Sequence, residues 1–271
     1  MRRGTKAGLR VVALTAATAA AGGAPLPAQN GGPPPTRPAS VPFGVGERAE
    51  YTVSLGILGD VGEGAMEVVG LEDVHGHETY HLRLDIEGKV LVGSVDTRLE
   101  SWLDTHQLFA RRFHKDQKEL SYEADRWYDF HPDSMIYRRR STGAVDTLAS
   151  SQPLDDVSFL YFARTLPLEV GDTYTFERYY KESGNPVRLE VLRREVMMNP
   201  NGDSIPVVVV QPIIQTGGLF GEGGEAEVYF TDDWRRILVK MTSKVPVIGR
   251  LGLTLTGYTP GRRLAESRGS P

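Results

Sequence analysis

The densest cluster of possible metal ligands in this 271-residue sequence consists of three histidines. His75 and His77 are separated by one residue, and His81 follows four residues later. Two imidazoles with this spacing on a strand share one face, as some zinc and copper sites require. Gly76 between them indicates a turn, however, and no fourth ligand is close in sequence. We therefore expect a solvated hairpin tip and predict no metal ion or cofactor.

Two pairs of adjacent acids, Asp155-Asp156 and Asp232-Asp233, are the next candidates for chemistry. Two carboxylates can divide acid and base roles when their environments separate their pKa values. Neighbouring residues of a strand point to opposite faces, so such pairs seldom converge on one substrate atom. A helix start explains the first pair and a hairpin turn explains the second. We predict no catalytic residue from either pair.

Motifs for a serine nucleophile or a phosphate-binding loop are missing from the sequence. It contains no Gly-x-Ser-x-Gly elbow. Residues 217–224 are glycine-rich but lack the Lys-Ser/Thr and the following helix that a phosphate cradle needs. The one basic triplet, at residues 138–140, is interpreted as a solvated strand end. The chain is therefore predicted to be neither an enzyme nor a nucleic-acid binder.

The N-terminus has the order of a secretory signal peptide. Residues 9–24 form a run of Leu, Val, Ala, Thr and Gly in which only Arg10 is charged, and Ala28 can precede a cleavage point. The first acidic residue is Glu47. The basic residues of the leader are Arg2, Arg3, Lys6 and Arg10. We expect cleavage near Ala28 and a periplasmic or extracellular location, with an uncleaved N-terminal anchor as the alternative.

Composition restricts what an exported domain could be. The sequence has no cysteine, which excludes a disulfide framework and a lipid-modified N-terminal cysteine. Without the leader, 27 Lys and Arg remain against 35 Asp and Glu, a net charge of −8. This balance does not favour nucleic acid or an anionic membrane as partner, and the apolar run of the leader is too short to span a bilayer. We therefore expect no transmembrane span in the mature protein.

Four segments follow from the composition along the chain. Residues 1–28 are the predicted signal peptide, and residues 29–41 form a linker rich in Pro and Gly. Residues 42–260 have the pattern of one β domain. Residues 261–271 are polar and predicted to be a disordered tail.

A period of two dominates the β domain. Tyr80, Leu82, Leu84 and Ile86 alternate with polar residues, as in a strand with one buried face. Similar runs recur about a dozen times and are separated by short turns, which favours an antiparallel meander. The predicted fold is all-β: one large curved sheet, forming a half-barrel or flattened barrel.

One segment departs from this period. Residues 153–167 are bounded by two prolines, and Asp155 and Asp156 near the start favour a helix N-terminus. The apolar residues that follow have helical spacing. We predict one short helix over residues 155–166, packed against the sheet.

These segments resemble a family of exported bacterial proteins, domain-of-unknown-function family 3108. Residues 42–53 are similar to its opening Pro-Phe-x-x-Gly-Glu motif, and residues 62–64 to the Gly-x-Gly/Ala that follows. Residues 155–168 with 170–172 resemble its central Asp-x-x-Ser-x-x-Tyr-x-x-Arg … Gly-Asp stretch. Residues 228–237 resemble its closing Asp-Asp-x-Arg-Arg-Ile motif. The resemblance implies a β-rich exported protein with no assigned activity, in which Gly46-Glu47 and Asp232-Asp233 determine turns.

A curved sheet with one apolar face can hold a hydrophobic molecule. The leading hypothesis is a non-catalytic envelope protein that binds a lipid or another apolar molecule, or that assists envelope assembly. The alternatives are a periplasmic hydrolase, with a site assembled from distant strands, and a purely structural interaction module. The residues expected to line the concave surface are Leu82, Leu84, Ile86, Ile237, Val239, Leu253 and Leu255.

Overall fold

The computed structural model describes residues 41–264 except 92, 120–121, 199–201, 217, 222–223 and 246–248. The predicted signal peptide with Ala28, nearly all of the predicted linker, and residues 265–271 of the predicted tail lie outside the described residues. At the start of that tail, Arg262 exchanges two backbone hydrogen bonds with Val45.

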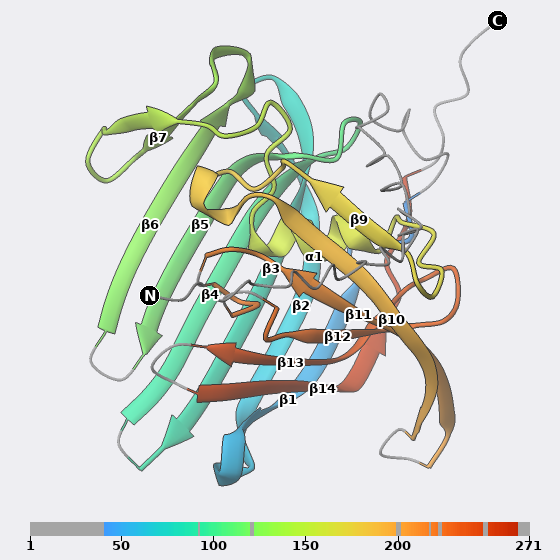
Figure 1. Cartoon of the computed structure of the whole chain (residues 1–271). Coiled ribbons are helices and arrows are strands. Elements are labelled where there is room, and N and C mark those ends of the chain that lie inside the picture. The colour runs from blue at the N-terminus through green and yellow to red at the C-terminus, as the bar shows by residue number, and fades with distance from the viewer. Residues whose placement is uncertain are drawn as a thin grey trace, which may run out of the picture. The chain divides into compact units, whose positions relative to one another are not determined.

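The described chain forms one antiparallel sheet (Figure 1). Its spatial order is β8-β7-β6-β5-β4-β3-β2-β1-β14-β13-β12-β11-β10-β9, and β8 and β9 are the two edges. The strands are β1 (Arg48–Leu55), β2 (Asp60–Val74), β3 (His77–Val90), β4 (Gly93–Asp104), β5 (Ala110–Glu119), β6 (Tyr122–His131), β7 (Ile136–Arg139), β8 (Val145–Thr147), β9 (Thr173–Phe176), β10 (Val187–Met198), β11 (Ser204–Ile213), β12 (Glu227–Thr231), β13 (Leu238–Val245) and β14 (Gly249–Thr259). Single 3-10 turns occur at η1 (Gly56–Leu58), η2 (Pro132–Ser134) and η3 (Glu182–Gly184). The prediction of one large curved antiparallel sheet is confirmed.

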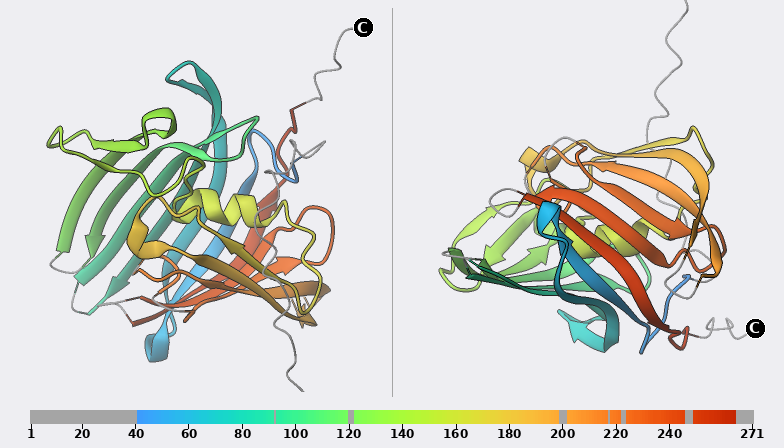
Figure 2. Two further views of the ribbon diagram at one scale, coloured as in Figure 1. Left: turned by 45° about the horizontal axis from the view of Figure 1, so that its top comes forward. Right: turned by 90° about the horizontal axis from the view of Figure 1, so that it is seen from below.

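The one α-helix of the described residues, α1 (Asp156–Ala163), lies inside the curve of the sheet (Figure 2). Asp155 is its N-cap and accepts hydrogen bonds from the backbone N–H groups of Val157 and Ser158, while the Ser158 hydroxyl accepts one from the Asp155 N–H. This capping box fixes the start of the helix. All eight helical residues are buried. The predicted helix over residues 155–166 is therefore confirmed, with an end three residues earlier.

A contiguous apolar core fills the space between α1 and the inner face of the sheet. It contains the helix residues Phe159 and Leu160 and the strand residues Leu82 and Leu253, each with at most 2% exposure. A smaller cluster of Val207, Val209, Tyr229 and Val239 lies on the opposite face. The four consecutive valines of β11, residues 207–210, are thus buried on both faces of the sheet.

A β-bulge in β13 changes which of its residues lie on the inner face of the sheet. Leu238 and Lys240 pair with consecutive residues of β12, which leaves Val239 as the extra residue between them. The two-residue alternation therefore fails at this point. Val239 joins the outer cluster, whereas Leu238 and Met241 join the main core. The prediction that Val239 shares a surface with Leu84 is wrong.

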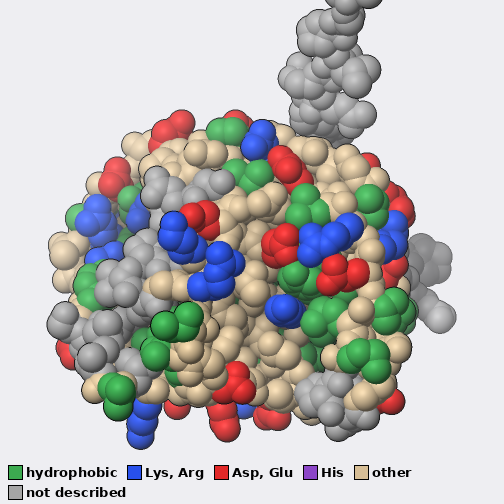
Figure 3. Space-filling view, turned by 60° about the horizontal axis from the view of Figure 1, so that its bottom comes forward, with side chains coloured by type: hydrophobic (Ala, Val, Ile, Leu, Met, Phe, Trp, Pro, Cys, Tyr) green, Lys and Arg blue, Asp and Glu red, His purple; other side chains and the backbone are tan. Residues whose placement is uncertain are grey.

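The surface of this unit is mixed in character. Figure 3 shows acidic, basic and apolar side chains interspersed on the face turned forward. Within the described ranges, no helix has the length and apolar character needed to cross a membrane.

Candidate functional site

The three histidines singled out in the sequence have separate partners. His75 lies 3.6 Å from Asp129, and the His77 ring lies 3.7 Å from Asp104. His81 pairs with Glu72 of β2 and Glu100 of β4. Across the described ranges, no group of three or more His, Asp or Glu side chains is arranged to hold a metal ion.

The two pairs of adjacent acids have structural roles. Asp155 is fully buried and accepts a 2.6 Å hydrogen bond from the Ser101 hydroxyl in addition to its cap bonds. Burial raises the pKa of Asp155 to about 7. Asp232 pairs with Arg194 and Arg236 beyond the end of β12, on the turn to β13. The interpretation of these pairs as helix start and hairpin turn matches their positions.

The residues expected to line a cavity are mostly packed side chains of the core. Leu82, Leu84, Ile86 and Leu253 are exposed by no more than 3% and belong to the cluster that contains α1. Leu255 is partly buried and contacts both clusters. Ile237 is buried just before β13 begins.

The family-like motifs meet at a buried ion pair. Arg164, directly after α1, donates hydrogen bonds of 2.6 and 3.1 Å to the two carboxylate oxygens of Glu47. The side chains are exposed by 3% and 6%. Although burial disfavours its charge, the Glu47 carboxylate raises the pKa of Arg164. Bidentate pairing of this kind fixes orientation as well as charge.

Other motif residues surround this pair. Arg164 also donates to the backbone carbonyls of Pro42 and Arg235, from the first and last motifs. Phe43 packs edge-on against Tyr161, and the Arg164 guanidinium lies over both rings. Gly46 adopts a positive φ of 83°, as expected for a turn, but Glu47 does more than determine that turn. Residues of the opening, central and closing motifs are therefore in contact with one another around Arg164.

A row of alternating acids and histidines crosses the outer face of β2 to β6. His81 lies 2.9 Å from Glu72 through Nδ1 and 2.9 Å from Glu100 through Nε2. His114 lies 2.9 Å from Glu100 through Nδ1 and 2.9 Å from Asp125 through Nε2. Only an imidazolium can donate from both nitrogens, so the two carboxylates that flank His114 favour its charged form. We call these five residues the histidine row.

Tryptophans shield the histidine row from water. The His81 ring stacks on Trp102 at 4.6 Å, and the His114 ring stacks on Trp127 at 3.8 Å. Burial opposes the charge of Glu100, yet hydrogen bonds from His114 and His81 lower its pKa to about 2. Burial also opposes the charge of His114, but hydrogen bonds to Glu100 and Asp125 raise its pKa. Both ring nitrogens of His81 and of His114 thus have a carboxylate partner.

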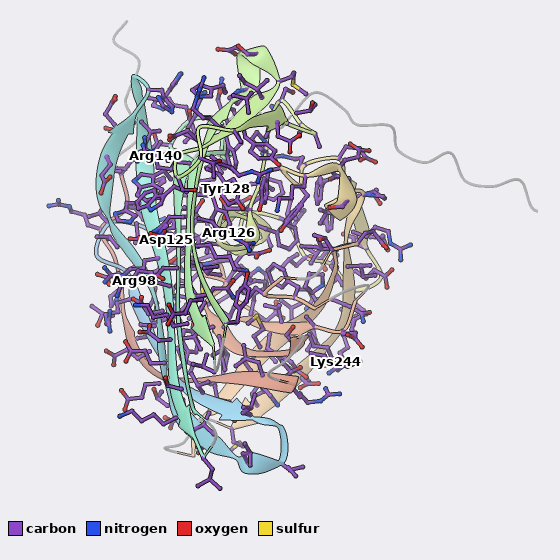
Figure 4. The ribbon with its side chains drawn as sticks, turned by 90° about the vertical axis from the view of Figure 1, so that its left-hand side faces the viewer. Arg98, Asp125, Arg126, Tyr128, Arg140 and Lys244 are labelled. Atoms are coloured by element: carbon purple, nitrogen blue, oxygen red, sulfur yellow. The ribbon has the colours of Figure 1, made fainter. Side chains whose placement is uncertain are left out.

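A pocket of about 450 Å³ opens on the inner side of β6 and β7. Its lining residues are Asp125, Arg126, Tyr128, Tyr137, Arg139, Ser141, Thr142 and Lys181. We call it the β6–β7 pocket. Figure 4 shows Arg126 and Tyr128 on the side of β6 that faces the rest of the fold, and Asp125 and Arg140 on the outer side.

Cations dominate the β6–β7 pocket. Burial lowers the pKa of Lys181, and so do the positive charges of Arg126, Lys115 and Arg139, although the Asp156 carboxylate acts in the opposite direction. Among the described residues no carboxylate pairs with Lys181 or Arg126, and Arg139 has a long 3.4 Å contact with Asp146. The Asp125 carboxylate is engaged by His114. The pocket thus gathers three cations, of which Lys181 and Arg126 form no ion pair within the described part of the chain.

Tyrosine rings form the apolar side of the same pocket. The Lys181 ammonium lies 5.0 Å from the centre of the Tyr180 ring and 5.5 Å from that of Tyr128. Behind them, Tyr128 packs against Phe113 and Tyr137. Cations beside aromatic faces suit a ligand with an anionic group and an apolar body.

Sequence reasoning missed this pocket. It treated residues 138–140 as one solvated basic triplet, but alternation in β7 separates them. Arg139 faces the pocket, while Arg140 faces outward and pairs with Asp129. The available signal was the strand period itself, which places the middle arginine on the same face as Tyr137.

Comparison with known proteins identifies the family. The chain matches "Protein of unknown function (DUF3108)" over residues 50–256. A similar solved structure is that of a beta-barrel-like protein of domain of unknown function DUF1849 from Brucella abortus, with 13% identity and a TM-score of 0.51 over 82% of this chain and 100% of that chain. At this identity the likeness shows a shared fold alone, and no curated protein matches this chain. Because the family match spans most of the sequence, the chain belongs to the DUF3108 family of proteins of unknown function.

Proposed function

We propose that this protein is an exported, non-catalytic envelope protein that binds an acidic amphiphile in the β6–β7 pocket. The ligand class is a molecule with a carboxylate or phosphate group and an apolar body. The single observation that carries the proposal is that Lys181 and Arg126 lie together beside the Tyr128 ring and form no ion pair with any described residue.

Three properties of the pocket support this ligand class. Its volume of about 450 Å³ is within the range of small-molecule sites. Because Lys181 and Arg126 have no ion-pair partner among the residues that the structure describes, they can bind an anion without first breaking an ion pair. The Ser141 and Thr142 hydroxyls at the rim can donate further hydrogen bonds to an oxyanion.

The packed interior of the sheet supports a ligand site in the β6–β7 pocket rather than between the sheet and α1. Leu84 and Leu253 contact the core that includes α1, so an apolar ligand held entirely within the sheet would have to displace that core. A ligand in the β6–β7 pocket needs no such displacement. The histidine row offers acid and base groups but no nucleophile, which favours binding over hydrolysis.

Native mass spectrometry of the protein purified from its own bacterial host tests the proposal. We expect a co-purifying acidic amphiphile on the wild-type protein and its loss from the double variant Arg126→Met/Lys181→Met. Arg138→Met is the matched control, because Arg138 pairs with Asp129 in register and lies on the outer face of β7. Equal ligand occupancy in the wild type and the double variant would refute the site. A neutral co-purifying molecule would refute the ligand class.

A further inference from the structure

The strand β10 extends past its neighbour at one edge of the sheet (Figure 1). β9 pairs only with Val187–Glu190 of β10, and Val191 then exchanges backbone hydrogen bonds with residues 171–172. β10 continues to Met198 and stays paired with β11 over this length. Within the described part of the chain, no backbone hydrogen bond covers the other side of residues 194–198. We call residues 194–198 the free edge of β10.

The free edge presents backbone groups that can pair with another strand. The N–H and C=O groups of a strand residue point to one neighbouring strand, and this direction alternates along the chain. Val191 bonds to the β9 side, so the next pair in register, Arg193 with its partner in β11, carries the hydrogen bonds between β10 and β11. The backbone groups of Arg194, Val196 and Met198 therefore point away from β11. They can receive a further antiparallel strand.

Apolar side chains accompany these backbone groups. Val196 and Met198 are exposed by 64% and 63%. Met197 lies opposite Ile205 and contacts the outer cluster, whereas Val196 points to the other face of the sheet. Exposed apolar residues at an unpaired edge are typical of a site where a strand is added.

The unpaired part of β6 has a different composition. β7 pairs with residues 128–131 of β6, which leaves residues 122–126 without a strand on that side in the described part of the sheet. Glu123, Asp125 and Arg126 place charges along this stretch. Charged side chains are a common protection against the addition of a strand. The sheet thus protects one of these long strands at its unpaired side by charge and leaves the other apolar.

The two charged residues of the free edge of β10 are neutralised within their own sheet. Arg194 pairs with Asp232 and Glu169, and Glu195 pairs with Arg193. These ion pairs hold the charged groups against neighbouring elements of the same subunit. They therefore protect the free edge less than the charges of β6 protect that strand.

Symmetry selects one register when the added strand is β10 of a second copy. A two-fold axis perpendicular to the sheet pairs residues of the same face around one central residue. Arg194 or Glu195 at the centre would lie opposite its own copy, and like charges in this position are destabilising. Val196 at the centre places valine against valine. The arginine then lies opposite Met198 and the glutamate opposite Met197, so that every residue of the free edge is paired.

We propose that two copies of this protein join through the free edges of β10, as antiparallel strands related by a two-fold axis at Val196. In this arrangement the pair of Val196 residues and the two pairs of Arg194 with Met198 each exchange two backbone hydrogen bonds. A second copy is the occupant because the free edge is complementary to itself in charge and in hydrogen-bonding direction. The dimer does not depend on the β6–β7 pocket, whose lining residues come from other elements.

Sedimentation velocity at protein concentrations from about 1 μM to about 1 mM tests the dimer. The contact is small, so we expect the wild type to pass reversibly from monomer to dimer within this range. Val196→Lys places two cations opposite each other and should associate at least about fivefold more weakly. Val145→Lys is the matched control, because Val145 is exposed by 49% on the opposite edge strand, β8. It should associate as the wild type does.

Three results of the sedimentation experiment would overturn the proposal. The first is a wild type that stays monomeric throughout, which would leave an extended segment of another protein as the occupant. The second is equal association of the wild type and Val196→Lys. The third is equal weakening by Val145→Lys, which would indicate head-to-tail pairing of β10 with β8. Both valines are exposed, so folding is expected to be retained in both variants.

A cross-link tests the register independently. The sequence contains no cysteine, so Val196→Cys and Met198→Cys each carry a single thiol. The proposed axis brings the two thiols at position 196 directly opposite each other, whereas those at position 198 are four residues apart along the strand, about 14 Å. A short bis-maleimide should therefore join Val196→Cys subunits at least about tenfold faster than Met198→Cys subunits. Equal rates, or a faster reaction at position 198, would overturn the pairing at Val196.

Discussion

Arg164 and Glu47 are 117 positions apart in sequence and form a bidentate, buried ion pair. Glu47 precedes the first strand and Arg164 follows the helix, so their contact ties the start of the sheet to the element inside its curve. Tyr258 near the end of β14 donates a further 3.1 Å hydrogen bond to the same carboxylate. The pair therefore joins the beginning, middle and end of the domain.

Removing one partner of this pair should destabilise the domain strongly. Arg164→Met leaves the Glu47 carboxylate buried without its cation, which typically costs about 3–5 kcal/mol. The measurement is the free energy of unfolding in urea. The double variant Glu47→Gln/Arg164→Met should lose less than the sum of the single variants, because neither charge is left unpaired. Strict additivity would show that the two side chains do not act as a pair.

Asp155 should make stability fall as the pH rises. Its carboxyl has a pKa of about 7 in the folded state against an ordinary value of 3.8, so the fold favours the protonated form. The stability that this preference contributes is fully present below about pH 3.8 and is lost as the pH rises to about 7. Asp155→Asn keeps an oxygen to cap the helix and should be more stable than the wild type at pH 8 by a few kcal/mol.

The control for this prediction is Asp155→Ala, which removes the cap and should be destabilised at every pH by about 1 kcal/mol or more. Thermal unfolding of the three proteins between pH 4 and pH 8 provides the comparison. Parallel pH profiles for the wild type and Asp155→Asn would contradict the assignment.

His114 should, like Asp155, make stability fall as the pH rises. The pKa of His114 is raised in the folded state, so its contribution is present below the ordinary value of 6.5 and disappears as the pH rises through the raised value. His114→Gln should therefore flatten the alkaline decline in the free energy of unfolding. NMR titration of the His114 ring checks the cause directly. A ring that titrates at or below the ordinary value would exclude the proposed charge pairing.

Leu84 tests whether the inner face is packed. It has no exposed surface and lies in the core cluster with α1, so Leu84→Ala should cost about 2–5 kcal/mol. The control Leu91→Ala removes a fully exposed side chain and should change stability little. Urea unfolding measures both. A loss below about 1 kcal/mol at Leu84 would indicate a hollow interior and favour a ligand within the sheet.

Sequence periodicity predicted the sheet and the helix because both depend on local patterns. The alternation at Leu82 and Leu84 and the cap at Asp155 are visible within a few residues. The strand β2 was harder to predict because its glycines and glutamates interrupt the alternation of apolar and polar residues. One of these glycines, Gly62, is required by the fold, since a side chain there would collide with the backbone oxygen of Glu87. Bulges such as that at Val239 depend on the partner strand and cannot be seen in one segment alone.

The candidate site was less accessible to sequence reasoning. The pocket brings together three cations that are far apart in sequence, Arg126 of β6, Arg139 of β7 and Lys181 just before η3. They meet only because the fold places these three elements side by side. The histidine row depends on register, which places Glu100 directly opposite His114 and His81 opposite Trp102. Neither register nor curvature follows from the spacing of residues within a strand.

The central claim is that the β6–β7 pocket binds an acidic amphiphile through Arg126 and Lys181. Fluorescence titration with an environment-sensitive fatty acid, beside its uncharged methyl ester, measures this most directly. We expect the wild type to bind the acid, and to bind the ester and inorganic phosphate at least about tenfold more weakly. The double variant Arg126→Met/Lys181→Met should lose the preference for the acid. Arg138→Met should keep it. Equal affinity of the wild type for acid and ester, or an unchanged preference in the double variant, would contradict the claim.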